Sequence, residues 1–396
     1  MQGPDRSPTL LIIGASVRSA IESAKRANVC ARGADLFADV DAVQQASVTR
    51  VTNYPGGFLP VVRSVAPAAV VYTGGLENYP ELIAEISQST LIWGNSAAVL
   101  RAVRSPENLV QAWTEDQVQH PAILRSPPTD PNRRWLQKSV TSTAGTGVRD
   151  WQPGSPVPED CYLQQFIPGR SCAALYVAAQ GRCQLLGVTE QLVDRSWTGA
   201  PRFGYAGSIG PLSLEPSIAT QCVRIGDCLA ARFPLRGLFG VDVIVQEDHV
   251  YPVEVNPRYT ASVEVWERAT GVAALEWHQR ACQETTDGVP FTLPDRPLSG
   301  ATSNVPPQRF GKAILFADRP CPVSSELVAL LASQQLADGQ SAFSDIPHPG
   351  QLIQTGHPVT TVWAQGPSVN EVEALLAQRV AELRQRLADD HSVAND

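Results

Sequence analysis

The chain has 396 residues, enough for two or three domains and too many for one small core. Its formal net charge is −8, which argues against a nucleic-acid partner, because phosphate binding favours a basic surface. The sequence contains no apolar run long enough for a membrane span. The eight cysteines form neither a C-x-x-C pair nor a zinc-spaced cluster, which favours reduced thiols in a cytoplasmic protein.

The first part of the chain alternates strand-like and helix-like segments. Apolar runs predict buried strands at 10–13, 68–72 and 91–93. Helical segments are expected to follow them, at 16–27, at 79–87 and after Asn95-Ser96. This order is typical of a β-α-β series with a parallel sheet.

The pattern changes after Pro106. Short strands of an antiparallel sheet are expected at 134–138, 160–166, 172–179 and 183–190. They are followed by a helix, two long strands and further helical pattern, at 216–232, 238–246, 249–256 and 262–283.

A segment rich in proline, 290–307, indicates a linker to the last part of the chain. Beyond it we expect a strand at 313–317, a loop at 345–358, a strand at 359–365 and a final helix. The final helix is expected to cover a sheet with one apolar face, formed by Val369, Val372, Leu375, Leu376, Val380, Leu383 and Leu387.

The two strands 238–246 and 249–256 carry polar residues inside apolar runs. A turn at Glu247-Asp248 joins the strands, so Asp242 and Glu254 lie at the same level and face one another. Asn256 lies two residues beyond Glu254, so the two side chains project from the same face. Two carboxylates and an amide oxygen are ligands that suit magnesium. The sequence therefore predicts a magnesium site on this hairpin.

Arg258 lies two residues further on and adds a positively charged fork to the same face. The alternative interpretation is a surface hairpin with scattered charges. Against it, these polar groups interrupt apolar strands, where an unpaired charge is costly to bury.

The stretch Glu254-Val255-Asn256-Pro257-Arg258 resembles the E-x-N-P-R-like ending of the ATP-grasp superfamily, whose members use ATP and magnesium to activate a carboxylate. The order of segments is similar over nearly the whole chain, and Gly74-Gly75-Leu76-Glu77-Asn78 resembles predicted carboligases related to biotin carboxylase. The resemblance implies an α/β and α+β architecture. An N-terminal Rossmann-like domain is expected at 1–104, a two-subdomain ATP-grasp domain at 105–289 and a C-terminal α+β part at 290–396.

The resemblance also implies roles for individual residues. The magnesium ligands match Asp242, Glu254 and Asn256, and the arginine that steadies the activated substrate matches Arg258. The lysine that contacts the ATP phosphates matches Lys138, which offers a point charge for them.

Two further segments match the parts of the superfamily that hold the nucleotide. The loop that closes over the phosphates matches 143–147, where Gly145 and Gly147 let backbone N–H groups approach. The hinge that binds adenine through its backbone matches 162–169, and the expected contacts are Gln164, Gln165, Phe166 and Ile167.

The sequence departs from the superfamily pattern in several places. Ser139 follows Lys138 where proline is usual, and Thr146 interrupts the glycine loop. The region 104–107 lacks the usual upstream lysine, so Arg104 is a candidate substitute. The segment 259–263, after Arg258, lacks the glutamate with which biotin carboxylases activate bicarbonate, and the nearest acids are Glu264 and Glu267.

These features predict a ligase that uses ATP and Mg²⁺ to convert a carboxylate to an acyl phosphate and join it to an amine. The partners implied are small-molecule acid and amine substrates, with an amino acid or cofactor precursor as the suspected acid. A biotin-carboxylase-like carboligase and a non-catalytic nucleotide-binding protein remain as alternatives. A dinucleotide-dependent dehydrogenase is a weaker one, because 14–19 lacks the full G-x-G-x-x-G pattern.

Two other features are candidate parts of the substrate site. Arg18, in the N-terminal turn, is a candidate anion contact. The stretch 197–211, with Arg202 and Tyr205, is a candidate loop over the acceptor site. No residue specifies the substrates or the oligomeric state.

Overall fold

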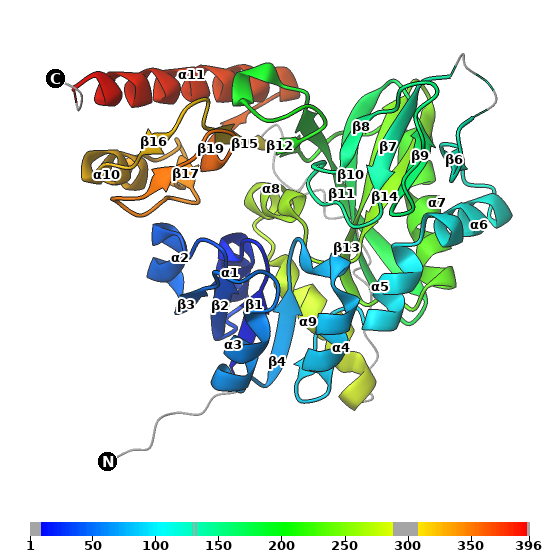
Figure 1. Cartoon of the computed structure of the whole chain (residues 1–396). Helices are drawn as coiled ribbons and strands as arrows, with labels where there is room; N and C mark the ends of the chain where they lie inside the picture. Colours follow the sequence, from blue (N-terminus) through cyan, green and yellow to red (C-terminus); the bar gives the residue numbers. More distant parts are fainter. Residues whose placement is uncertain (1–8, 129, 131–132, 288–307, 394–396) are drawn as a thin grey trace.

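The computed structural model describes residues 9–128, 130, 133–287 and 308–393. The N-terminal part is a five-stranded parallel sheet of order β3-β2-β1-β4-β5, with helices on its two faces (Figure 1). Its strands are β1 (Leu10–Ile13), β2 (Ala31–Asp35), β3 (Val48–Arg50), β4 (Ala69–Tyr72) and β5 (Leu91–Ile92). The connecting helices are α1 (Arg18–Arg26), α2 (Val40–Gln45), α3 (Phe58–Val65), η1 (Leu76–Asn78), α4 (Pro80–Ser87) and α5 (Ala97–Val103). The predicted parallel β-α-β series is confirmed.

A small antiparallel sheet follows helix α6 (Pro106–Glu115) and has the order β6-β9-β7-β8. Its strands are β6 (Ile123–Leu124), β7 (Trp135–Ser139), β8 (Val148–Asp150) and β9 (Cys161–Gln165). The predicted strands at 134–138 and 160–166 are confirmed as β7 and β9.

The largest sheet has eight strands in the order β14-β13-β10-β11-β12-β15-β19-β17. Strands from the middle of the chain are β10 (Arg170–Ala179), β11 (Arg182–Val193), β12 (Tyr205–Gly210), β13 (Gly237–Gln246) and β14 (His249–Asn256). Strands from its last part are β15 (Arg309–Phe316), β17 (Phe343–Ser344) and β19 (Pro358–Gly366). Because β12 pairs with β15, the last part of the chain extends the same sheet.

Two predictions for this region are wrong in detail. The stretch 197–211 is not only a loop, because it contains the 3₁₀ turn η2 (Ser196–Thr198) and strand β12. The helical segment 262–283 is two helices, α8 (Ala261–Thr270) and α9 (Ala274–Asp287). Gly271 separates them in a left-handed conformation, with φ of +72°, that ends α8.

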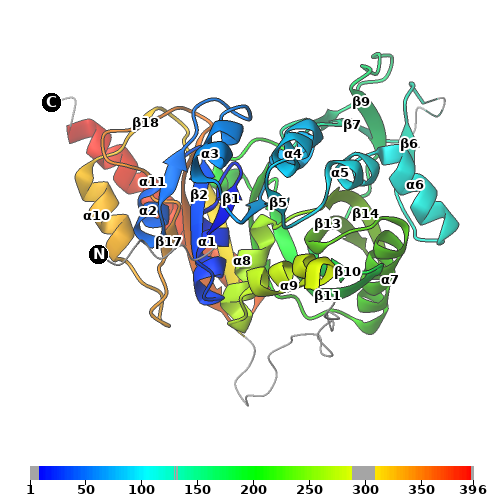
Figure 2. The same ribbon diagram turned by 90° about the horizontal axis from the view of Figure 1, so that it is seen from below.

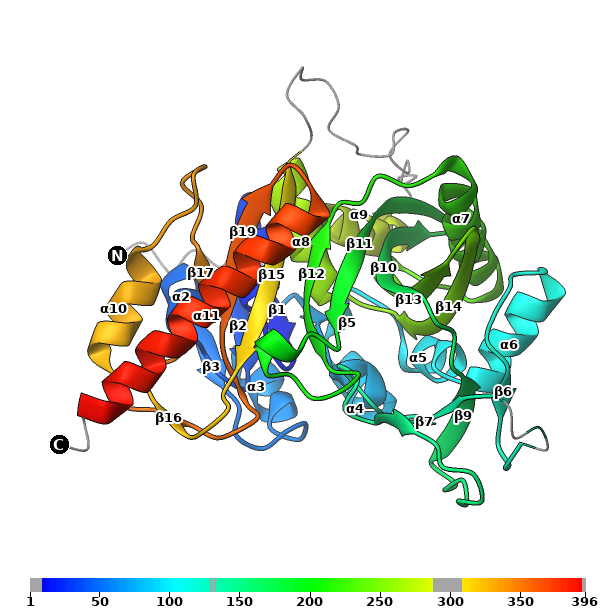
Figure 3. The same cartoon turned by 90° about the horizontal axis from the view of Figure 1, so that it is seen from above.

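Helices cover both faces of the large sheet. Helix α7 (Pro216–Arg232) packs on β11 and β14, and α11 (Val369–Val393) lies across β15 and β19 (Figure 3). The remaining elements are α10 (Ser325–Ser333), β16 (Cys321–Pro322) and β18 (Leu352–Ile353). The predicted covering role of α11 is confirmed, with one correction: Leu375 is 39% exposed and does not belong to its buried face.

Helices α8 and α9 lie between the parallel sheet and the large sheet (Figure 2). The two sheets share an apolar core in which Ile12, Leu175 and Trp266 are all fully buried. The N-terminal part is therefore held against the face of the sheet that carries the predicted hairpin. The predicted linker 290–307 lies outside the described residues, and the two boundaries between the three predicted domains remain predictions. No helix in the described ranges is both long and apolar enough to cross a membrane.

Candidate active site

The β13–β14 hairpin places its polar side chains as predicted. Asp242 pairs with Glu254 in the register, across a turn at Glu247 and Asp248. The Asn256 side-chain amide donates a hydrogen bond to Asp242 Oδ2 over 3.3 Å. All three side chains line one cavity, which confirms that they share a face of the sheet.

The cavity has a volume of about 1000 Å³ and is lined by all three parts of the chain. Thr73 and Gly74 come from the carboxyl end of a parallel strand, Lys138 from the small sheet, and Thr361 from the last part of the large sheet. This volume is at the upper end of the range for ligand sites, which is about 300–1000 Å³. It has room for a nucleotide and a second small molecule side by side.

The pKa values of the two facing carboxyl groups are shifted in opposite directions. Burial and, next to it, the neighbouring charge of Glu254 together raise the pKa of Asp242 to about 7. Burial also acts to raise the pKa of Glu254, but Arg104 and Lys138 outweigh it, so the net pKa of Glu254 is lowered. Asp242 thus has too few positively charged neighbours to neutralise it, and a carboxylate pair of this kind is suited to a divalent cation.

Lys138 enters the cavity from β7. Its Nζ donates to the backbone oxygen of Val253 over 3.1 Å and to Gln164 Oε1 over 3.3 Å. Burial acts to lower the Lys138 pKa, but Tyr162 and the hairpin carboxylates outweigh it, so the net pKa is raised. A fixed ammonium group therefore lies on the cavity wall beside the hairpin.

The predicted hinge follows β9 and also lines the cavity. Its lining residues include Gln164, Gln165, Phe166 and Ile167. Gln164 Nε2 donates to the Val253 backbone oxygen over 3.2 Å, which ties the hinge to strand β14. The Arg134 guanidinium lies 3.8 Å from the centre of the Phe166 ring and covers it.

The glycine loop between β7 and β8 reaches the cavity at Thr143, Ala144 and Gly145. Gly145 has φ of +77°, and a Cβ atom there would collide with the carbonyl oxygen of Phe203. Gly147 lies outside the cavity lining and packs against Ser142. Of the two predicted loop glycines, only Gly145 faces the cavity.

Arg258 is held by the N-terminal part. Its Nη2 forms an ion pair of 2.6 Å with the buried Glu77 and donates to Asn256 Oδ1 over 3.2 Å. Gly74 passes close to the same guanidinium, 3.6 Å from its central carbon to a Cβ atom built on the glycine. The segment Gly74–Asn78 therefore fixes the arginine above the hairpin carboxylates.

Comparison with known proteins gives the same fold. A family model described as an ATP-grasp domain matches residues 107–262. Residues 107–262 are therefore similar to ATP-grasp domains. The predicted superfamily and fold class are thereby confirmed.

Solved ATP-grasp structures resemble the whole chain in fold. Carboxyaminoimidazole ribonucleotide synthase from Aspergillus clavatus, complexed with ATP, has a TM-score of 0.69 at 15% identity, covering 96% of this chain and 99% of that chain. A putative ATP-grasp protein from Archaeoglobus fulgidus has a TM-score of 0.54 at 16% identity, covering 78% and 94%. Both identities are low, so these likenesses concern the fold alone.

A curated relative is the tyramine–L-glutamate ligase of Methanocaldococcus jannaschii. It is 24% identical over 142 residues, which make up 35% of this chain. The chain spans 40% of the length of that relative.

The structure places Arg104, the candidate substitute for an upstream phosphate lysine, beside a hairpin carboxylate. It forms an ion pair of 2.6 Å with Glu254, and it lies outside the lining of the ATP-grasp cavity. Its Nη2 donates to Asn78 Oδ1 and to the backbone oxygens of Val140 and Ser142, over 2.9, 3.4 and 3.1 Å. Arg104 thus joins a hairpin carboxylate to the N-terminal part and to the base of the glycine loop.

Arg18 is also engaged differently from the prediction. It is 2% exposed and pairs with four carboxylates, those of Glu22, Asp41, Glu264 and Asp345. Arg18 lines the cavity, but its charge is more than balanced by these four carboxylates.

Of the two residues named for the predicted acceptor loop, one lines the cavity and the other does not. Tyr205 lines the cavity, and its hydroxyl lies 2.8 Å from Ser208 Oγ. Arg202 pairs with Asp150 on the small sheet and is 60% exposed, outside the cavity lining.

Several cavity residues were not predicted from the sequence. Gln191 on β11 donates to Asp242 Oδ1 over 3.0 Å and accepts from Ser171. Lys312 on β15 and Asp345 enter from the last part of the chain. Each is distant in sequence from the hairpin, and none belongs to a recognisable motif.

Proposed function

We propose that the chain is an ATP- and magnesium-dependent ligase that forms a carbon–nitrogen bond. The observation that supports it most is the convergence of Asp242, Glu254 and Asn256 with Lys138 and Arg258 around one cavity. Phosphoryl transfer depends on positioning and on charge stabilisation, and these five side chains supply both.

The residues present fit a magnesium ion. Asp242 has a raised pKa because it is buried beside Glu254 with too little positive charge. Asp242, Glu254 and Asn256 would hold the ion through oxygen atoms, as magnesium requires. When bound, magnesium supplies charge neutralisation for the nucleotide phosphates.

The nucleotide is expected between the small sheet and the large sheet. The backbone of Gln165–Ile167 would meet the adenine edge, and the Phe166 side chain adds an apolar surface. Lys138 would contact the phosphates, and the backbone N–H groups at Ala144 and Gly145 would approach them from the loop.

The reaction proceeds in two displacements. A carboxylate oxygen of the acid attacks the γ-phosphorus of ATP, ADP leaves, and an acyl phosphate forms. The nitrogen of the amine then attacks the acyl carbon, inorganic phosphate leaves, and the nitrogen loses a proton to give the amide. Arg258 and Lys138 stabilise the negative charge on the transferring group, and the buried Glu77 keeps Arg258 in place.

The known proteins are consistent with this chemistry. The curated relative is by its name a ligase of tyramine and L-glutamate, an amine and an acid. We extend the reaction type to this chain but not the two substrates.

The bicarbonate alternative is disfavoured by the acids that follow Arg258. Glu264 is bonded to Arg18 and to Lys312, over 2.7 and 2.9 Å. Glu267 is bonded to Arg26, Ser23 and Tyr259. Both carboxylates are 1% exposed and are committed to structural contacts, so neither is placed to act as a base for bicarbonate.

The test is a matrix of acids and amines in which phosphate release is measured with Mg-ATP. An active pair should release phosphate only when acid and amine are both present. Lys138→Ala should abolish that release, whereas Arg101→Gln, at an exposed position outside the cavity, should not. Bicarbonate-dependent turnover stimulated by free biotin would instead establish the carboligase alternative. ATP binding without turnover on any pair would establish the non-catalytic one.

A further inference from the structure

The last part of the chain contributes a half-buried carboxylate to the wall of the large cavity. Asp345 precedes β19 in the chain and lines the cavity with a side chain that is 28% exposed. Arg18 Nε donates to Asp345 Oδ1 over 2.7 Å, and the Thr361 hydroxyl donates to Oδ2 over 2.5 Å. Arg18 Nη2 also donates to Oδ2, over 3.4 Å, so the remaining acceptor position is on Oδ1.

The backbone of Asp345 is fixed as firmly as its side chain. Its φ is +55°, an uncommon value for a residue with a Cβ atom. Both Asp345 N–H and Ile346 N–H donate to the Asp41 carboxylate, over 2.9 Å each. One carboxylate is therefore held rigidly on the cavity wall by contacts from two distant parts of the chain.

The charges around Asp345 are unbalanced in the negative direction. Arg18, Lys312 and Arg268 share four carboxylates, namely Glu22, Asp41, Glu264 and Asp345. Arg18 and Lys312 line the cavity, and Asp345 is the one of these four carboxylates that does so, so a ligand would meet the negative excess at Asp345.

A neighbouring group reports the same excess. Asp39 is buried beside this cluster, and burial together with Asp345, Asp41 and Asp35 raises its pKa to about 9. A carboxyl that keeps its proton at neutral pH indicates that further negative charge is not tolerated there. A cation entering the cavity would relieve this repulsion.

Asp345 lies far from the hairpin carboxylates. Thr361, its hydroxyl partner, is on β19, and Asp242 is on β13, five strands away in the same sheet. At about 4.8 Å between strands, this is a path of about 24 Å along the sheet, and less in a straight line because sheets twist.

The wall between the two ends is largely apolar. Ile314 and Phe316 alternate with other residues on β15 and line the cavity from one face, and Tyr205 lines it from the next strand. Phe37 contributes an aromatic ring from the N-terminal part. An extended molecule with an apolar stem fits such a wall.

We infer that the acceptor is an extended di- or polyamine, whose remote ammonium group binds Asp345 while its other nitrogen attacks the acyl phosphate. The attack of the other nitrogen on the acyl phosphate rests on the proposed ligase function. The binding of the remote ammonium group to Asp345 can be tested without turnover. A monoamine with a short stem would not span the distance between the two ends.

The experiment measures binding calorimetrically on the full chain, without ATP, and uses spermidine, 1,8-diaminooctane and 1-octanol as probes. Wild type should bind the two amines about tenfold more tightly than 1-octanol, since a charged hydrogen bond contributes about that much. Asp345→Asn should remove this preference. Thr361→Val, which keeps the carboxylate, should retain a preference for the diamine.

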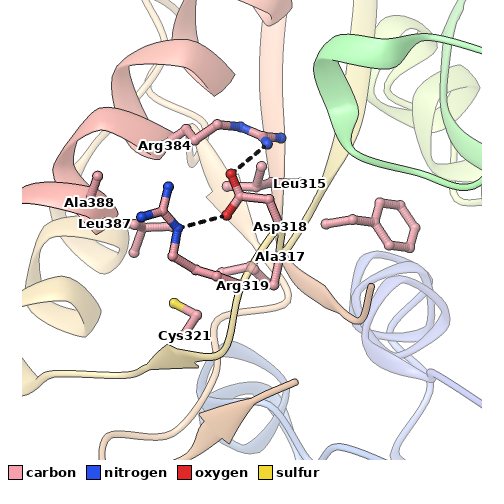
Figure 4. Close-up of a pocket in the computed structure, with 10 residues that line it drawn as sticks. Leu315, Ala317, Asp318, Arg319, Cys321, Arg384, Leu387 and Ala388 are labelled. Atoms are coloured by element: carbon pink, nitrogen blue, oxygen red, sulfur yellow. Dashed lines mark hydrogen bonds and ion pairs between the residues drawn. The ribbon is translucent and has the colours of Figure 1, made fainter. Parts of the chain in front are cut away.

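The matched control is Asp318→Asn. Asp318 pairs with Arg319 and Arg384 in a small surface pocket under α11 (Figure 4) and lies outside the lining of the large cavity. This variant should bind all three probes as wild type does.

Equal affinity of wild type for 1,8-diaminooctane and 1-octanol would overturn the inference, and this comparison needs no variant. Retention of the preference in Asp345→Asn would overturn the role of that carboxylate. Turnover with other amines but no polyamine binding would contradict the inference alone. Polyamine binding without phosphate release on any acid would contradict the ligase function alone.

Discussion

At the scale of single residues, the decisive contacts are those that hold the hairpin carboxylates. Arg104 is 11% exposed and bonds Glu254 directly, so it sets the position of one predicted magnesium ligand without facing the nucleotide itself. Gln191 does the same for Asp242 from the other side. These residues are positioning residues for the site.

Replacing Arg104 by Gln is therefore expected to weaken Mg-ATP binding and to destabilise the fold. The change leaves Glu254, which is 23% exposed, without its partner, and this should cost less than the about 3 kcal/mol of breaking a fully buried pair. Titration calorimetry and thermal melting measure the two effects. Arg101→Gln is the control, because Arg101 lies on the same helix but pairs with Glu81 on the surface. Equal Mg-ATP affinity in wild type and Arg104→Gln would contradict the positioning role.

Asp39 gives a prediction about pH. Its folded-state pKa is raised to about 9 by burial and by neighbouring carboxylates, against about 3.9 for an unfolded chain. Between these two values the unfolded chain releases the Asp39 proton and the folded protein retains it. The free energy of unfolding therefore decreases as the pH rises from about 4 to about 9. Asn cannot ionise, so Asp39→Asn should be more stable than wild type by a margin that increases over this range.

Melting temperatures of both proteins at pH 5 and pH 8 measure this margin. Asp248→Asn, at an exposed turn, should show no such trend. A margin that is the same at both pH values would mean that Asp39 ionises normally in the folded protein.

At the scale of elements, the glycine loop between β7 and β8 depends on one residue. Gly145 has φ of +77° and leaves no room for a Cβ atom beside Phe203. Gly145→Ala is expected to displace the loop from β12 and to raise the KM for ATP about tenfold, with little change in melting temperature, because the loop is on the surface. Steady-state kinetics in ATP measure this.

The control for this variant is Gly154→Ala. Gly154 also has a positive φ, of +84°, but a Cβ atom there would meet nothing within 4 Å. Gly154→Ala therefore measures the backbone strain of a Cβ atom at positive φ, about 1 kcal/mol, without a steric collision. If both variants change the KM for ATP equally, contact with Phe203 does not position the loop.

The sequence predicts long periodic elements well and short polar ones badly. Helix α7 was predicted to the residue, and the hairpin register was correct, since its apolar runs and turn are unambiguous. Strands β2 and β3 were missed because Ala31–Asp35 and Val48–Arg50 contain too few apolar residues to mark a buried strand. Strand β12 was missed because Gly207 and Gly210 give its sequence the appearance of a loop.

In the candidate site, too, some features could be predicted from the sequence and others could not. Asp242, Glu254 and Asn256 could be placed together because the hairpin rule relates neighbours in sequence. The partners of Arg18 and Arg104 could not be predicted, because they lie up to 327 residues away in sequence. A charged residue read without its partners therefore looks available for a ligand when the fold has already neutralised it.

At the scale of the whole molecule, the cavity exists only where three parts of the chain meet. The small sheet brings Lys138, the hairpin brings the carboxylates, and the N-terminal part fixes Arg258 through Glu77. The last part of the chain adds β15 and β19 to the same sheet and so closes the end of the cavity. Substrate contacts from all three parts are what a ligase with three substrates requires.

The measurement that tests the account most directly is ATP binding with and without Mg²⁺, by calorimetry, in wild type and Glu254→Gln. The change keeps the shape of the side chain and removes the charge. Magnesium should strengthen ATP binding in wild type about tenfold or more, and this gain should be lost in Glu254→Gln. Glu247→Gln, at the exposed turn of the same hairpin, should behave as wild type. An undiminished effect of magnesium in Glu254→Gln would contradict the assignment of the hairpin as the magnesium site.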